Sequence, residues 1–176
     1  MTQGLRNRRE RCPGESHVES TAAVLVEHCV EIAADRACVW HALTEPASVV
    51  VWDVGIIAPL DAPADYPQPG QVVRWSYRLL GFPTTLVDRP QEVVPQVRLR
   101  TLIALAFLRI DETYTLEPLP GNPEGTRLTA QLYLSNTLPL LSGAFDRHFS
   151  RALATSTVRE SLGAIRDFCE KNRRNA

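Results

Sequence analysis

Apolar and polar side chains alternate from residue 24 to residue 32, as they do in a strand that is buried on one face. The mainly apolar face of this strand consists of Val24, Val26, His28, Val30 and Ile32. Two short helices are predicted next. Asp35 suits the N-cap of a helix that ends near Leu43, and Thr44 and Pro46 suit the start of a second helix that ends near Trp52.

A proline-rich loop over residues 59–70 separates these helices from a series of further strands. The alternation predicts strands over 72–80, 82–89, 97–104, 108–118 and 126–135. The segment 120–125, with its glycines, prolines and asparagine, has the composition of a turn. Strands this close in sequence, joined by short turns, form an antiparallel meander.

A long amphipathic helix is predicted from residue 144 to about residue 171, which is roughly 28 residues or 42 Å. Its apolar stripe consists of Phe145, Phe149, Ala152, Val158, Leu162, Ile165 and Cys169. Only the apolar face of the sheet is long enough to receive this stripe. The sequence therefore predicts an α+β fold, in which a curved antiparallel sheet of about seven strands wraps around the long C-terminal helix. This geometry leaves an internal cavity where the sheet and the helix do not touch.

The length of 176 residues and the 44% of hydrophobic residues suit one globular domain, which we place at residues 22–176. Residues 1–21 are polar and aperiodic, and we expect a flexible tail there. The net charge of -1 gives the chain no general reason to bind nucleic acid. No apolar run approaches the roughly 18 residues of a membrane span, and no secretory signal is recognised. We therefore expect a cytoplasmic protein without stable membrane insertion.

The four cysteines are Cys12, Cys29, Cys38 and Cys169, and in a cytoplasmic chain we expect them to be free thiols. Two of them lie near His28 and His41, and zinc accepts all of these residue types. However, His28 and Cys29 are neighbours on a strand and point to opposite faces, so both cannot reach one ion. Nucleotide-binding and serine-hydrolase motifs are absent from the sequence as well. We therefore expect no metal and no cofactor.

Two polar residues, His28 and Glu112, interrupt faces that are otherwise apolar. A charge in an apolar interior costs several kcal/mol unless it is paired or neutralised. Burial would raise the pKa of Glu112 and lower the pKa of His28. A carboxylate and an imidazole at one cavity suit general acid–base catalysis on an enolisable ketone. The alternative is that each is a satisfied interior residue or a residue at a strand end that reaches water.

Aromatic residues on the predicted inner faces are candidates for the lining of a pocket. The candidate ligand-binding residues are Trp52, Trp75, Tyr77, Phe82 and Tyr114. Trp75 and Tyr77 share one face of their strand, and Tyr114 shares a face with Glu112. The alternative is ordinary core packing, because the core and the wall of a pocket are the same surface in such a fold.

Four sequence features, in this order, resemble a known superfamily. They are the strand 26–32 followed by the helix start AADRACVW at 33–40, Trp52 at the end of the second short helix, Gly70-Gln71-Val72-Val73 before a strand, and Gly125-Thr126-Arg127-Leu128-Thr129 at the last strand. Over residues 23–172 the chain resembles the START-related, Bet v 1-like (SRPBCC) superfamily and, within it, the bacterial polyketide cyclase/dehydrase-like proteins. The resemblance implies the helix-grip fold. It transfers no catalytic residue, because the superfamily hosts many functions and shares no universal one.

Three functional hypotheses follow from the sequence. The first is a protein that binds a small hydrophobic or aromatic molecule, a lipid or a polyketide-like metabolite, in the internal cavity. The second is a cyclase or dehydratase that uses His28 and Glu112 as acid and base. The third is an interaction module with a vestigial cavity, which would expose a large apolar patch. Whether the chain forms a homodimer is left open.

Overall fold

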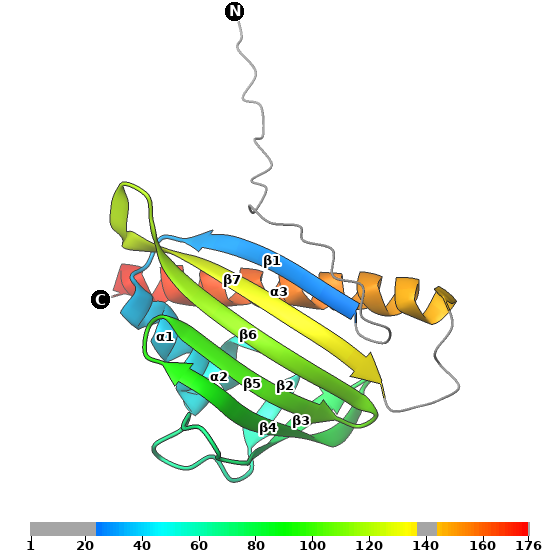
Figure 1. Ribbon diagram of the computed structural model, residues 1–176. Helices are drawn as coiled ribbons and strands as arrows, with labels where there is room; N and C mark the ends of the chain where they lie inside the picture. The colour runs from blue at the N-terminus through cyan, green and yellow to red at the C-terminus, as the bar shows by residue number, and fades with distance from the viewer. Residues whose placement is uncertain (1–23, 137–143, 176) are drawn as a thin grey trace, which may run out of the picture.

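The computed structural model describes residues 24–136 and 144–175. The elements are β1 (Val24–Ile32), α1 (Arg36–Thr44), α2 (Pro46–Trp52), β2 (Ile56–Pro59), β3 (Val73–Leu79), β4 (Phe82–Val94), β5 (Arg98–Leu105), β6 (Leu108–Leu119), β7 (Asn122–Asn136) and α3 (Ala144–Asn175). The strands form one antiparallel sheet in the order β1-β7-β6-β5-β4-β3-β2. In Figure 1 the sheet is curved, α3 runs along β1 and β7, and α1 and α2 lie at one end. The predicted α+β helix-grip fold is confirmed.

The strands differ from their predicted bounds where the alternation of side chains is broken. β2 has only four residues and pairs with β3 through a shift in register, so it is too short and irregular for a periodic pattern to mark it. β4 continues to Val94, because a shift in register between Pro90 and Glu92 breaks the alternation without ending the strand. β7 begins within the predicted turn, at Asn122, and α3 extends to Asn175.

The starts of α1 and α2 are fixed in different ways. The carboxylate of Asp35 accepts a hydrogen bond of 2.8 Å from the backbone amide of Cys38, which confirms Asp35 as the N-cap of α1. The prediction that Thr44 caps α2 is wrong. Thr44 is the last residue of α1, and its hydroxyl donates to the carbonyl of Trp40 at 2.8 Å. Glu45 precedes α2 without a side-chain cap, and Pro46 supplies the first helical position.

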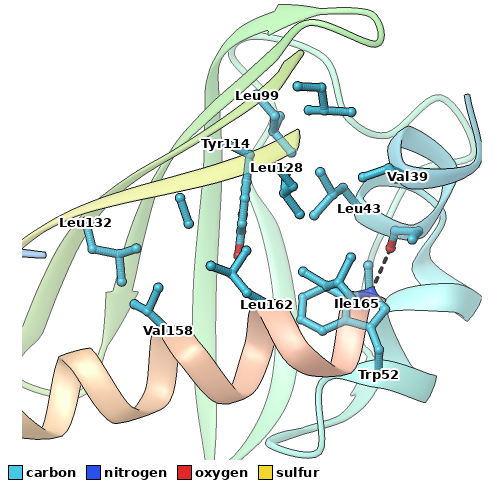
Figure 2. Packing of buried hydrophobic residues seen from close by; sticks show 14 of the residues in the cluster. Val39, Leu43, Trp52, Leu99, Tyr114, Leu128, Leu132, Val158, Leu162 and Ile165 are labelled. Atoms are coloured by element: carbon cyan, nitrogen blue, oxygen red, sulfur yellow. Dashed lines mark hydrogen bonds between the residues drawn. The ribbon is translucent and has the colours of Figure 1, made fainter. Parts of the chain in front are cut away.

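The described part of α3 packs mainly on β1 and has smaller contacts with α1, α2 and β7. Of the predicted apolar stripe, the side chains of Phe145 and Phe149 lie outside the described residues, and Ala152 is exposed rather than buried. The other four, Val158, Leu162, Ile165 and Cys169, are each less than one tenth exposed. Figure 2 shows three of them facing the apolar residues of the sheet and of α1 and α2. Burial of such side chains stabilises the fold by about 1.5–3 kcal/mol each. In the part of the chain that the structure describes, no helix is both long and apolar enough to cross a membrane.

Candidate ligand-binding site

Strands β3 to β6 carry a group of polar side chains on the face that also bears Trp75 and Tyr114. These strands lie beyond β1 and β7, with which α3 makes its contacts to the sheet. In β6 the side chains of Glu112 and Tyr114 share this face, because residues two apart in a strand point the same way. Glu112 lies directly opposite Thr101 of β5, and Tyr114 lies opposite Leu99. The register of an antiparallel pair therefore places the Thr101 hydroxyl on the same inner face as the Glu112 carboxylate.

Asp88 of β4 is the centre of a hydrogen-bonded group on this face. Tyr66, from the loop before β3, donates its hydroxyl to Asp88 Oδ2 at 2.7 Å, and Thr101 donates to Asp88 Oδ1. Trp75 also donates to this carboxylate and meets the ring of Tyr66 edge to face, with ring centroids 5.8 Å apart. Burial raises the pKa of Asp88, and these three donors oppose the rise. Asp88 is 5% exposed, so its carboxylate is a satisfied interior group.

Glu112 has a different environment from Asp88. Burial raises the pKa of Glu112 from 4.5 to about 7, a hydrogen bond from Tyr114 opposes the rise, and the negative charges of Asp88 and Asp53 add to it. Glu112 points inward from the middle of a strand, and as a whole residue it is half-buried. Its carboxyl group is therefore an inward group that is protonated and ionised to similar extents near neutral pH.

Asp53 and Tyr77 extend the polar group toward α2 and β2. Asp53 follows the last residue of α2, and its carboxylate accepts a hydrogen bond of 2.9 Å from the amide of Gly55. Burial raises the pKa of Asp53, and burial and the charges of Asp53 and Glu112 raise the pKa of Tyr77. A Cβ atom at Gly55 would lie 2.5 Å from the ring of Tyr77, so the absence of a side chain there lets the ring take this position.

His28 lies on the concave face of β1 but not beside Glu112. It is opposite Ala130 of β7, which is in turn opposite Tyr114, so His28 and Glu112 are two strands apart and offset by two residues along the strands. Strand spacing puts their backbones about 12 Å apart, which excludes a direct hydrogen bond. Burial and the charge of Arg159 on α3 lower the pKa of His28, and Glu27 opposes the change. The structure brings Glu112 and Tyr114 together, whereas the acid–base pair of His28 and Glu112 stays a prediction that needs a molecule spanning both.

The remaining predicted ligand-binding residues take different positions. Trp75 is 2% exposed and belongs to the Asp88 group. Trp52 is 8% exposed and donates its indole N–H to the carbonyl of Ala42 at 2.7 Å, which ties α2 to α1 (Figure 2). Phe82 is 76% exposed beside the turn between β3 and β4, and the structure does not bring it to the polar group.

Sequence analysis missed Asp53, Tyr66, Asp88 and Thr101. The signal for Asp88 was present, because it interrupts the inner face that Leu86 begins, just as Glu112 interrupts the face of β6. Tyr66 lies in a proline-rich loop without any periodic pattern, so nothing in the sequence indicates that its hydroxyl reaches Asp88. A contact of this kind depends on the path of the loop in three dimensions.

The prediction that all four cysteines are free thiols is confirmed only in part. Cys38 and Cys169 are free, as expected, and the Cys169 thiol lies 4.0 Å from the carbonyl of Cys38. Cys29 is disulfide-bonded, so the expectation of a free thiol is wrong there, while Cys12 lies outside the described residues. That expectation rested on a reducing cytoplasm, where disulfides are rare. The Cys29 disulfide does not support a cytoplasmic location, which stays a prediction.

Two surface hollows lie away from the polar group. One, next to Ala33 near the end of α3, is lined by Glu170, Arg173 and Arg174, which already bond to neighbouring groups. The other lies on the convex face of strands β4 to β7. Among the described residues, no group of three or more histidine, cysteine or acidic side chains has the geometry to hold a metal ion.

Comparison with known proteins identifies the fold. No family model matches the sequence, and no curated protein matches it. A START superfamily protein from Mycobacterium smegmatis is 17% identical with a TM-score of 0.68, and the match covers 84% of this chain and 97% of that one. The Zhui aromatase/cyclase from Streptomyces sp. R1128 is 19% identical with a TM-score of 0.63, covering 85% and 94%.

Ara h 8.0201 is a more distant structural match, 10% identical with a TM-score of 0.57 over 81% of this chain and 97% of that one. Identities this low show the fold alone. The chain therefore has the helix-grip fold of START-related, Bet v 1-like proteins, and its function must be argued from its own side chains.

Proposed function

We propose that the protein binds a small hydrophobic or aromatic molecule between the concave face of the sheet and α3. The observation that carries the proposal is that the inward residues Glu112 and Tyr77 are half-buried rather than fully buried, beside buried apolar residues. Protein interiors are close-packed, and their polar groups are normally enclosed with partners. An inward polar surface that stays accessible is what a ligand site requires.

The composition of this face supports a ligand with an apolar body. The apolar residues around the polar groups include Trp75, Leu86 and Leu99, each of which is less than one tenth exposed. Tyr77 and Tyr114 offer both ring faces and hydroxyl groups. Small-molecule sites in proteins combine a mainly apolar lining with a few polar groups that orient the ligand.

A fluorescent dye tests the proposal. N-phenyl-1-naphthylamine is neutral and apolar, and we expect it to bind the protein saturably at about one site, with increased emission. Replacement of Tyr77 or Tyr114 with alanine removes ring contacts worth about 1 kcal/mol and is expected to change the affinity about fivefold. Native mass spectrometry of freshly purified protein then looks for a molecule that co-purifies.

Tyr133→Ala is the matched control, because Tyr133 is 47% exposed and lines the hollow on the opposite, convex face of the sheet. Its removal should leave the affinity for the dye unchanged. Absence of saturable binding would contradict the proposal. Binding that only the Tyr133 variant alters would place the dye on the convex face instead.

A second candidate function is that of a cyclase or dehydratase, and the pKa of Glu112 near 7 is the observation that favours it. A general base works best when its pKa is near the working pH. The Glu112 carboxylate would take a proton from the carbon next to a ketone. Protonated Glu112 would then release the Tyr114 hydroxyl, which would donate its hydrogen bond to the enolate oxygen instead. His28 would serve as a second acid at the far end of an extended substrate. One structural match is described as an aromatase/cyclase, which is compatible with this chemistry.

Proton exchange separates the two candidates. In D₂O the methyl protons of 2-acetylnaphthalene exchange with solvent through its enolate, and NMR follows their loss. An enzyme would speed this exchange, and Glu112→Gln would slow it by about 10²-fold or more. Glu117→Gln, on the other face of the same strand, is the control. Saturable dye binding without accelerated exchange favours the binding protein.

A further inference from the structure

Arginines and acidic residues are distributed unequally between the two faces of the sheet. Strands β3 to β6 carry six arginines: Arg74, Arg78, Arg89, Arg98, Arg100 and Arg109. The register places all six on the convex face, opposite to the direction of Trp75, Asp88 and Glu112. Four of these arginines therefore find neutralising or hydrogen-bonding partners outside, such as Asp61 for Arg74 and Asp111 for Arg100.

The concave face of the same strands has carboxyl and hydroxyl groups instead. Asp88 and Glu112 point inward, with Asp53 beside them, and Tyr66, Tyr77, Tyr114 and Thr101 add hydroxyls. Within the described strands β3 to β6, no basic side chain shares this face. Of the described basic groups, His28 lies on the concave face of β1, two strands from Glu112, and Arg159 of α3 is exposed.

Glu112 and Tyr114 are the groups of this set that a ligand would meet. Glu112 is half-buried as a residue, and among the described residues Tyr114 is the one hydrogen-bond donor to its carboxylate. Tyr114 is 7% exposed, and Figure 2 shows its hydroxyl directed away from its strand toward α3. A carboxylate has room for about four hydrogen bonds, so Glu112 can accept further donors. Asp88, with three donors, has much less capacity left.

A ligand with its own carboxylate would bring a second negative charge to this face without a cation to balance it. A ligand with N–H or O–H groups would instead satisfy the free acceptor positions, and a positive charge would gain further from the low local dielectric. We infer that the bound molecule is an apolar amine or phenol that presents its donors to Glu112, an inference that rests on the ligand site proposed above. Fatty acids and other apolar carboxylates are expected to bind more weakly.

A series of naphthalene compounds with one ring system tests this inference. The compounds are 1-naphthylmethylamine, a cation; 1-naphthalenemethanol, a neutral donor; and 1-naphthoate, an anion. Each displaces N-phenyl-1-naphthylamine from the protein at about pH 8, where Glu112 is mostly ionised. We expect the amine to displace the dye at a concentration at least about tenfold lower than the carboxylate, with the alcohol between them.

Glu112→Gln removes the charge with little change in shape and is expected to reduce the preference for the amine over the carboxylate by at least about fivefold. Glu117→Gln makes the same change on the convex face of β6 and should leave the preference intact. Circular dichroism of both variants confirms that they are folded.

The outcomes separate this inference from the proposed function. Failure of the dye to bind the unmodified protein overturns the proposed site, and this inference with it. Saturable dye binding that naphthoate displaces as well as the amine does overturns the inference about the ligand and leaves the site. A preference for the amine that survives in Glu112→Gln and disappears in Glu117→Gln would place the recognition on the convex face, which also overturns it.

Discussion

Replacement of Glu112 by glutamine should change how the stability of the protein depends on pH. The native state holds the Glu112 proton up to a pKa of about 7, whereas the ordinary value is 4.5. Between these pH values the native state binds more protons than the unfolded state, so the free energy of unfolding falls as pH rises. The stabilising contribution is complete below about pH 4.5 and is lost as pH rises through 7. Glutamine cannot ionise and does not show this loss.

The magnitude follows from the difference between the two pKa values. One pKa unit corresponds to about 1.4 kcal/mol, so the rise from 4.5 to about 7 corresponds to a loss of between about 3 and 4 kcal/mol on going from acid to alkaline pH. Asp53 and Asp88, whose pKa values are also raised, add losses of the same sign, and His28, with a lowered pKa, acts in the opposite direction. These groups are present in both proteins. The difference between Glu112→Gln and the unmodified protein therefore isolates Glu112.

Urea unfolding, followed by circular dichroism at about pH 5 and about pH 8, measures this difference. We expect Glu112→Gln to gain about 2–3 kcal/mol relative to the unmodified protein between these two pH values. Glu117→Gln, on the exposed face of the same strand, should show no such gain. A Glu112→Gln difference that is the same at both pH values would refute the reasoning, because it would mean that Glu112 is as well solvated in the native state as in the unfolded state.

Two further predictions concern the frame that holds the site. Leu162→Asp should lower the free energy of unfolding by several kcal/mol in urea titrations, because Leu162 is 3% exposed and an unpaired charge is costly there. Arg159 is exposed, so Arg159→Asp should change the free energy of unfolding by less than about 1 kcal/mol. Equal effects of the two substitutions would mean that the helix presents a different face to the sheet. Asp35→Ala should lower the stability measured by thermal unfolding by about 1 kcal/mol, because the cap on the Cys38 amide is lost, and Asp35→Asn should restore most of this stability. An Asp35→Ala variant as stable as the unmodified protein would show that the cap contributes nothing.

The sequence predicted the fold well where the side-chain period was long and uninterrupted. The inner face of β1 and the stripe of α3 each extend over several repeats, so hydrophobic burial alone determines which side faces inward. β2 has four residues, and β4 passes through a break in register at Pro90, so neither gives a continuous pattern. The order from β3 to β7 follows from the short turns, because an antiparallel meander brings consecutive strands together, whereas no local pattern in the sequence places β1 beside β7.

The candidate site was predictable only where a polar residue interrupts an apolar face. Glu112 was found in this way, Tyr114 was found as an aromatic residue on the same face, and their contact follows from their spacing in β6. The position of His28 across the sheet was not predictable, because the alternation gives the face of a residue but not the number of strands between two residues. Tyr66 reaches Asp88 from a loop, and such a contact is set by the tertiary structure rather than by a local pattern.

The two inward carboxyl groups of the sheet have different consequences for the protein. Asp88 is nearly fully buried and is held by Thr101, Tyr66 and Trp75, so its hydrogen bonds join β4, β5, β3 and the loop before β3 into one unit. Loss of one member of such a network leaves buried polar atoms without partners, which is a cost in stability. Glu112 has fewer partners and more accessible surface, so the fold stabilises it poorly. A residue that lowers stability at neutral pH needs another reason to be there, and contact with a bound molecule supplies one, because a donor on the ligand would lower the energy of the ionised carboxylate.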